Sequence, residues 1–145
     1  MKDHQLSSPI KPSIINELNT PVFAPQLFIN SGVKNIDFYI KALGAVELRR
    51  FMNDDGTYHV SELSINVAMF HLHEESQRTH SFSPEKFNAS TTTIGLFVSD
   101  VDAFMNSAIA AGATVVSPAQ DYEYGYRQGE IRDPFGHIWM FEMKI

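Results

Sequence analysis

Two histidines and two carboxylates follow one another closely near the middle of the chain. His71 and His73 are two positions apart, and Glu74 and Glu75 come directly after them. Residues i and i+2 of a β-strand share a face, so a strand here places the two imidazoles side by side. Imidazole pairs bind transition metals, but the same spacing also fits histidines of an ordinary core or surface. The sequence leaves both interpretations open.

Aromatic and basic side chains gather later in the chain. Tyr122, Tyr124 and Tyr126 alternate, and Arg127 follows the last of them. Tyrosine rings and a guanidinium suit the rim of a small-molecule site, because they offer stacking surfaces and hydrogen-bond donors. Alternate tyrosines can equally cover a half-buried strand. Nothing in the sequence separates the two interpretations.

Motifs for nucleophilic and nucleotide chemistry are missing. The sequence has no Gly-x-Ser-x-Gly elbow, no phosphate-binding glycine loop and no dinucleotide fingerprint. His137 follows a glycine turn and is expected to fix that turn through hydrogen bonds. Trp139, the single tryptophan, is expected in the core.

The composition excludes several protein classes. The chain has 145 residues, 43% of them hydrophobic, with 11 basic and 17 acidic side chains and a net charge of −6. This composition fits one globular domain, and the lack of a basic cluster argues against nucleic-acid binding. No apolar run approaches the roughly 20 residues of a membrane helix. Cysteine is absent, which rules out disulfides and thiolate metal sites, and a cytoplasmic location is the expectation.

Residues 1–21 are expected to form an arm that precedes the domain. Pro9 and Pro12 interrupt this segment, and it lacks the continuous apolar stretch of a signal peptide. Its apolar residues allow one short helical turn over 14–18.

From residue 22 onward, the pattern alternates strands with two helices. Apolar residues at helical spacing over 33–43, ended by Gly44, predict the first helix. Ser99 and Asp102 form a capping-box signature for the second helix, which ends at Gly112. Alternating or β-branched runs between turn signals predict strands over 25–30, 45–51, 58–65, 67–74, from 91 onward, and over 114–117, 124–132 and 136–144.

The two halves repeat one another at a nearly constant distance. Leu27 stands 69 positions before Leu96, and an offset of 68 relates Glu62–Glu74 to Glu130–Glu142. The same kinds of element also recur in the same order. Such a duplication predicts two structural modules of equal topology.

The sequence therefore predicts an α+β fold of two tandem βαβββ modules. Module one spans 22–75, a linker spans 76–90, and module two spans 91–145. One module cannot bury the apolar side of its sheet alone. We expect two curved mixed sheets around a shared cleft, with the helices on the outer faces.

Residues in both halves resemble the vicinal oxygen chelate superfamily, which includes glyoxalase I, bleomycin-resistance proteins and extradiol dioxygenases. The resemblance rests on Ile36–Tyr39 with Leu43–Ala45, on Ile94–Val101 and above all on Arg132–Trp139 (RDPFGHIW). The closing turn, together with Tyr124–Arg127 (YGYR), looks most like the PhnB-like branch. Because proteins of one fold can have different functions, the resemblance predicts the fold more specifically than the activity.

The resemblance implies a metal site whose ligands this chain lacks. Metal-dependent members take His or Gln from the first strand of each module and Glu from the last. The matching positions here are Ala24, Leu72, Thr93 and Met140, none of which is a credible ligand for a divalent ion. We therefore expect no metal and no other cofactor. Substitute ligands would have to come from Gln26, His71, His73 and Glu142.

The face on which the histidine pair lies can be predicted in two ways. The offset of 68 places His71 and His73 opposite Trp139 and Phe141, which should pack toward the helices. Amphipathicity predicts the reverse, because the residues that alternate with the histidines are apolar. We follow the repeat, whose register holds over thirteen positions.

Three functions compete. The first is binding of a small organic molecule without metal, in an apolar cleft lined by Gln26, Phe28, Phe70, Leu72, Thr93, Phe97, Tyr124, Tyr126, Arg127, Ile138, Met140 and Glu142. The second is a metal-dependent lyase, isomerase or dioxygenase with the substitute ligands. The third is a metal-free enzyme in which Glu142 acts as a base in that cleft.

A homodimer is the expected assembly. The segments Val67–Leu72 and Trp139–Phe141 carry no permanent charge and are expected to leave an edge or face that needs cover. A two-fold contact would supply that cover with the same patch on both subunits. Ile14, Ile15 and Leu18 of the arm are expected to clasp the partner.

Overall fold

The computed structural model describes residues 5–6 and 19–145. Over these residues the chain forms two α-helices, one short 3-10 helix and nine strands. It divides into two compact units: the first holds the described residues up to Ile36 together with 44–83, and the second holds 37–43 and 84–145. The predicted α+β class with two mixed sheets is confirmed. Neither helix in the described part is long and apolar enough to span a membrane.

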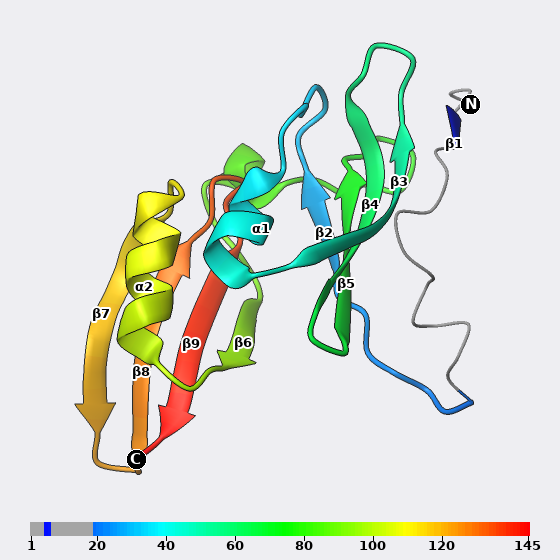
Figure 1. Ribbon diagram of the computed structural model, residues 1–145. Coiled ribbons are helices and arrows are strands. Elements are labelled where there is room, and N and C mark those ends of the chain that lie inside the picture. The colour runs from blue at the N-terminus through cyan, green and yellow to red at the C-terminus, as the bar shows by residue number, and fades with distance from the viewer. Residues whose placement is uncertain (1–4, 7–18) are drawn as a thin grey trace. The chain divides into compact units, whose positions relative to one another are not determined.

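The sheet of the first unit consists of β1 (Gln5–Leu6), β2 (Gln26–Ile29), β3 (Val46–Met52), β4 (Tyr58–Ile65) and β5 (Ala68–Glu74). The strand order is β1-β3-β4-β5-β2 (Figure 1). β3, β4 and β5 form an antiparallel meander, whereas β2 runs parallel to β5. One side of this sheet is apolar and buried, and it includes Leu27, Ile29, Leu63, Phe70 and Leu72.

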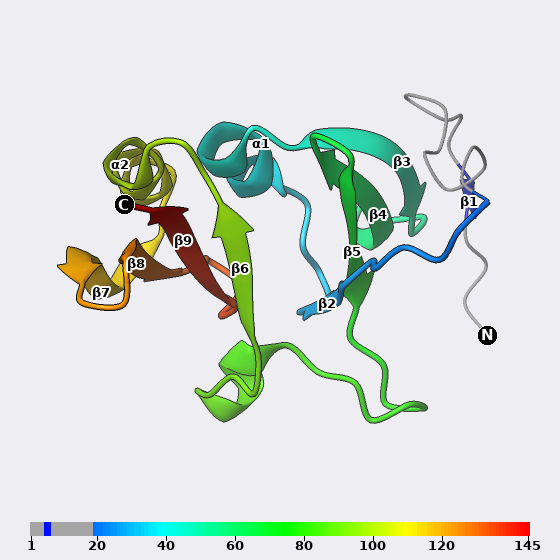
Figure 2. The same cartoon turned by 90° about the horizontal axis from the view of Figure 1, so that it is seen from below.

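The second unit contains α1 (Asp37–Leu43), the 3-10 helix Pro84–Phe87, β6 (Thr93–Phe97), α2 (Val101–Ala110), β7 (Thr114–Tyr122), β8 (Tyr126–Arg132) and β9 (Ile138–Lys144). Its strand order is β6-β9-β8-β7, with β6 parallel to β9. α2 covers one face of this sheet (Figure 2), where the Phe104 ring lies 5.5 Å from that of Phe141. Val101, Met105 and Ala108 form the buried stripe of α2.

A buried carboxylate organises the closing turn of the second unit. Asp133 is 3% exposed, and its Oδ2 accepts hydrogen bonds from Tyr39 Oη at 2.7 Å and Trp139 Nε1 at 3.0 Å. Its Oδ1 accepts from the backbone N–H groups of Phe135 and His137, at 2.8 and 3.1 Å. Burial, and then the charge and hydrogen bond of Asp133, raise the pKa of Tyr39, so its hydroxyl keeps its proton and acts as a donor. The His137 backbone N–H thus helps to fix the turn, and the role predicted for its side chain stays a prediction.

The element boundaries differ from prediction where tertiary contacts compete with local pattern. The first helix begins at Asp37 rather than at 33, and the Val33 carbonyl instead accepts a hydrogen bond from Tyr58 N at 2.8 Å. The N-cap of α2 is Asp100, not Ser99, because the Asp100 side chain accepts from Ala103 N at 3.0 Å. β7 continues through Pro118, which an edge strand tolerates.

The strand pairing corrects the register of the internal repeat. Leu27 lies beside Leu72 in the first sheet, and Leu96 lies beside Phe141 in the second. Since Leu27 and Leu96 are 69 positions apart, Leu72 and Phe141 are structural equivalents at that same offset. The predicted offset of 68 is therefore wrong in the last strand of each sheet.

The loop before the last strand explains this shift. Four residues, 65–68, separate Ser64 from its paired residue Met69. Five residues, 133–137, separate Arg132 from its paired residue Ile138. The turn that Asp133 organises therefore contains the extra residue, and every equivalence beyond it moves by one position.

The strand order also corrects the predicted sheet edges. β5 and β9, which contain the uncharged segments, lie inside their sheets, and the edge strands are β1 and β2 in one sheet and β6 and β7 in the other. Parallel pairing covers the predicted edges, because β2 adds beside β5 and β6 adds beside β9. Gln5–Leu6 of the predicted arm pairs with β3, whereas Ile14, Ile15 and Leu18 lie outside the described residues. The homodimer stays a prediction.

Candidate functional site

Each sheet has a second face, opposite its buried apolar side chains. In the first unit we call it the histidine face, formed by Gln26, Phe28, Arg49, Glu62, His71 and His73. In the second unit we call it the tyrosine face, formed by Thr93, Phe97, Tyr126, Gln128, Met140 and Glu142 with the adjoining Tyr122 and Tyr124. Strand alternation places each set on one side of its sheet.

The histidine pair lies opposite to the face predicted from the repeat. His71 is the structural equivalent of Met140, and His73 that of Glu142, because the offset in this strand is 69. The amphipathic pattern predicted this placement correctly. Phe70 and Leu72, predicted to line a cleft together with Phe28, instead lie on the buried side of the sheet.

A row of polar side chains crosses the histidine face. Arg49 pairs in register with Glu62, Glu62 with His71, and His71 with Gln26. Arg49 Nε, Glu62 Oε2 and the Nε2 atoms of His71 and His73 are buried without a hydrogen-bond partner among the described residues. His71 Nε2 lies 3.7 Å from Glu62 Oε1, which is too long for a hydrogen bond. This face therefore carries hydrogen-bonding capacity that the described chain does not use.

Neighbouring side chains keep the two imidazoles neutral near pH 7. Their rings stack with centroids 5.6 Å apart, and the Phe28 ring lies 5.8 Å from that of His73. Burial, together with the nearby His71 and His59, lowers the pKa of His73 to about 4. Burial also lowers the pKa of His71, against the opposing effect of Glu62.

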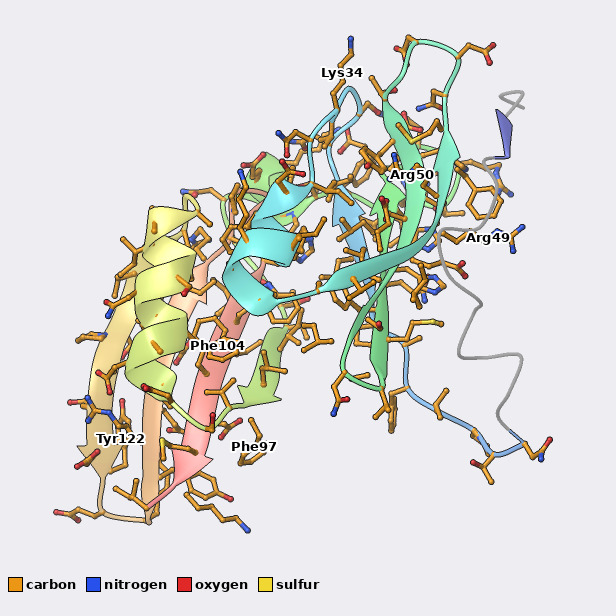
Figure 3. The ribbon with its side chains drawn as sticks, viewed as in Figure 1. Lys34, Arg49, Arg50, Phe97, Phe104 and Tyr122 are labelled. Atoms are coloured by element: carbon orange, nitrogen blue, oxygen red, sulfur yellow. The ribbon has the colours of Figure 1, made fainter. Side chains whose placement is uncertain are left out.

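The opposite side of β3 is charged as well. Figure 3 shows Arg49 and Arg50 pointing to opposite sides of this strand. Arg50 forms an ion pair with Glu47 at 2.5 Å, and Ser61 Oγ donates to Glu47 at 2.6 Å. The buried Glu47 is thus fully engaged in structure and is not a candidate for ligand binding.

The residues present do not fit the metal that the resemblance implies. With the corrected register, the four matching positions hold Ala24, His71, Thr93 and Met140, and only His71 offers a ligand atom. A zinc site needs three or four protein ligands. Across residues 5–6 and 19–145 there is no group of three His, Asp or Glu side chains placed to hold a metal ion.

The tyrosine face presents a continuous ladder of aromatic rings. The Phe97 and Tyr126 rings meet edge to face at 5.9 Å, Tyr126 and Tyr124 do so at 5.9 Å, and Tyr124 stacks on Tyr122 at 5.2 Å. Phe97 is 62% exposed and Tyr124 is 65% exposed. Phe97 and Tyr122 lie toward the same end of this sheet, whereas Phe104 extends from α2 on the opposite face (Figure 3).

Glu142 lies beside this ladder and has a defined orientation. Gln128 Nε2 donates to Glu142 Oε1 at 2.9 Å, and Tyr124 Oη donates to Gln128 Oε1. Partial desolvation by its neighbours raises the pKa of Tyr124, and the charges of Tyr122 and Glu142 add to the effect. Tyr124 therefore stays protonated and orients the amide that holds the carboxylate.

The sequence grouped Arg127 with the tyrosines, and the structure separates it from them. Its guanidinium forms ion pairs with Asp102 of α2 and with Asp121, each at 2.9 Å. These hydrogen bonds raise the pKa of Arg127. Arg127 thus lies on the α2 side of the sheet and binds the helix rather than a ligand beside Tyr126.

Sequence reasoning missed a polar pocket in the first unit. The pocket has a volume of about 510 Å³ and is lined by Ser31, Gly32, Asn53, Asp54, Asp55, Thr57 and Glu74. Glu74 Oε2 lies 3.1 Å from His59 Nδ1 and accepts a hydrogen bond from Asn53 Nδ2 at 3.2 Å. The Asn53–Gly56 turn signal marked the loop, but only the sheet places Glu74 beside it.

Sequence comparisons place the chain among known proteins. The model of the Glyoxalase/Bleomycin resistance protein/Dioxygenase superfamily matches residues 21–141. The uncharacterized protein Rv0887c of Mycobacterium tuberculosis is 38% identical over 122 residues, which are 82% of this chain and 72% of that protein. The uncharacterized protein At5g48480 of Arabidopsis thaliana is 32% identical over 117 residues, 75% of this chain and 69% of that protein.

Solved structures share the fold. The X-ray structure of the Arabidopsis thaliana At5g48480 gene product matches with a TM-score of 0.66 and 26% identity, over 86% of this chain and 99% of that one. TioX from Micromonospora sp. ML1 matches with a TM-score of 0.62 and 25% identity, over 86% of this chain and 100% of that one. These similarities extend over both units of the chain.

Proposed function

Because the chain belongs to the glyoxalase/bleomycin resistance protein/dioxygenase superfamily, we propose that its tyrosine face binds a small organic molecule without the superfamily's metal. The observation that carries this proposal is the exposure of Phe97 and Tyr124 within one connected ladder of rings. Aromatic rings supply large contact areas at low conformational cost, and one oriented carboxylate beside them supplies specificity. Phe97, Tyr126, Met140 and Glu142, which the sequence assigned to the binding site, all belong to this face.

The metal-free part of the proposal rests on the residues at the superfamily's ligand positions. Ala24, Thr93 and Met140 have no atom that suits a divalent cation. A molecule on this face is therefore held by ring contacts, hydrogen bonds and charge.

Calorimetric titration with three soluble aromatic probes tests the proposal. Phenyltrimethylammonium, benzenesulfonate and benzyl alcohol share one ring and differ in charge. We expect at least one to bind with a Kd on the order of millimolar, as its size allows. The double variant Phe97→Ala/Tyr124→Ala should weaken that binding at least about tenfold. Phe23→Ala removes a ring that is 96% exposed in the first unit, and it should leave binding unchanged. Absence of binding by all three probes contradicts the proposal.

A second candidate is a metal-dependent lyase, isomerase or dioxygenase with substitute ligands. The observation in its favour is that the buried Nε2 atoms of His71 and His73 have no hydrogen-bond partner among the described residues. Metal analysis of the purified protein separates the two functions. Stoichiometric metal that is lost in His71→Ala would favour the enzyme, whereas metal-free protein that binds an aromatic probe favours the binding function.

Three finer assignments belong to the same proposal. The closing turn Asp133–His137, together with Tyr124–Arg127, supports placement in the PhnB-like branch. The absence of cysteine supports a cytoplasmic location. A homodimer is proposed because the edge strands β2 and β6 carry no charged side chain that would oppose pairing with a second copy. Light scattering at micromolar concentration tests the dimer, and a mass near 16.3 kDa would contradict it.

A further inference from the structure

The carboxylate of Glu142 uses only part of its hydrogen-bonding capacity. Gln128 donates to Oε1, and no residue in the described chain donates to Oε2 or forms an ion pair with Glu142. Oε2 lies above β6, where a Cβ added at Gly95 would approach it to 2.8 Å. The absence of a side chain at Gly95 thus leaves room for the carboxylate.

The orientation of this carboxylate is set before any ligand arrives. Tyr124 Oη donates to Gln128 Oε1, which leaves the Gln128 amide nitrogen directed at Glu142. The resulting chain of hydrogen bonds holds Glu142 as an acceptor. A positioned acceptor binds a donor with a smaller loss of side-chain freedom than a mobile one.

Aromatic side chains occupy strand positions next to the same carboxylate. Phe97 pairs in register with Glu142 across β6 and β9, and the Tyr126 ring meets the Phe97 ring at 5.9 Å. The faces of aromatic rings carry negative charge density that attracts cations. The carboxylate and the ring faces therefore both favour a positively charged ligand.

Other charges on the tyrosine face do not cancel this preference. Lys144 follows two positions after Glu142 on the same side of β9 and is exposed, but no ion pair joins the two among the described residues. Glu130 and Arg132 lie further along β8. The whole chain has a net charge of −6, which also attracts cations.

We propose that the ligand of the tyrosine face is an organic cation, a substituted ammonium with an aromatic or aliphatic body, whose positive charge lies between Glu142 Oε2 and the rings of Phe97 and Tyr126. This inference rests on the proposed function and names its ligand class. The negative charge of the carboxylate repels an anionic ligand at this place. A neutral aromatic ligand leaves Oε2 without an ion-pair partner.

The three probes used above distinguish the ligand classes. We expect phenyltrimethylammonium to bind at least about fivefold more tightly than benzyl alcohol, and benzenesulfonate to bind more weakly than either. Glu142→Gln keeps the shape of the side chain and should remove the preference for the cation, with less than about a twofold change for benzyl alcohol. Asp54→Asn removes one negative charge from the turn of the first unit and should leave the preference intact.

Two further measurements extend the test, and the first of them needs no variant. Raising the salt concentration should weaken phenyltrimethylammonium binding to the unaltered protein and leave benzyl alcohol binding unchanged. Lys144→Gln should strengthen cation binding. Equal affinity for cation and neutral probe, or an unchanged preference in Glu142→Gln, overturns the inference while the proposed function stands. If no probe binds, both fail.

Discussion

The histidine face and the tyrosine face are built on equivalent strands and differ in chemistry. At an offset of 69, Gln26 corresponds to Gly95, Phe28 to Phe97, His71 to Met140 and His73 to Glu142. The first face holds buried polar atoms that find no hydrogen-bond partner in the described part of the chain, whereas the second exposes aromatic rings beside an oriented carboxylate.

The buried sides of the two sheets stayed alike while these faces diverged. Leu27 and Leu96 are equivalent, and so are Leu72 and Phe141. Burial of apolar area stabilises the sheet in both units and constrains these positions. Positions on the opposite side are free of that constraint, so one duplicated scaffold can carry two different surfaces.

The largest expected effect concerns Asp133, which has no counterpart in the first hairpin. Asp133→Ala removes the acceptor of four hydrogen bonds and leaves buried donors on Tyr39 and Trp139. We expect a loss of about 3–5 kcal/mol in the free energy of unfolding, measured by urea denaturation. Tyr39→Phe should cost about 1–2 kcal/mol. The control is Asn66→Gly in the equivalent turn of the first unit, where Asn66 has φ of 54°. This variant should change the free energy of unfolding by no more than about 1 kcal/mol. Equal losses at the two turns would break the comparison.

A glycine in the same turn should give the next largest effect. Gly136 has φ of +96°, and a Cβ there would approach the Glu85 backbone nitrogen to 2.9 Å. Gly136→Val should therefore destabilise the fold by about 3 kcal/mol in thermal or urea unfolding. Gly44 has φ of +66° with no atom near an added Cβ, so Gly44→Ala should cost only about 1 kcal/mol. A Gly136→Val protein as stable as the unaltered one would contradict this account.

Acid should lower the free energy of unfolding, and His73 of the histidine face should account for part of the loss. The pKa of His73 is about 4 in the folded protein and near 6.5 when unfolded, so the unfolded chain binds more protons between these values. Stability should therefore fall as the pH decreases from 7 to 5, with about 1 kcal/mol of the loss due to His73 after allowance for solvent screening. His73→Gln should reduce this pH dependence. An unchanged profile in that variant would show that the imidazole is not desolvated.

The smallest effect is expected at Arg127. Its ion pairs with Asp102 and Asp121 lie at the surface, where solvent screens the charges, so they contribute little to stability. Arg127→Met should lower stability slightly and leave the affinity for aromatic probes unchanged. A large loss of probe binding in this variant would instead show that Arg127 contributes to the ligand site, as the sequence predicted.

Local patterns were sufficient for much of the fold. β4 was predicted over 58–65 and occupies those residues, because alternation and turn signals agree there. The first helix was predicted four residues too long, since the hydrogen bond from Tyr58 to Val33 depends on a strand distant in sequence.

The site was harder to predict, because it depends on register. One extra residue in the Asp133 turn changed the equivalents of His71 and His73, which no count along the sequence reveals. The amphipathic pattern around these histidines did contain the correct answer. Arg127 was misplaced since its partner Asp102 lies on a helix 25 positions away.

The central claim is that the tyrosine face, and not the histidine face, receives the ligand. Chemical-shift mapping by NMR during titration with phenyltrimethylammonium tests it most directly. We predict that the shift changes concentrate at Phe97, Tyr124, Tyr126 and Glu142, and that the ring signals of His71 and His73 stay in place. Shift changes concentrated at His71 and His73, with the tyrosine face unaffected, would contradict the account.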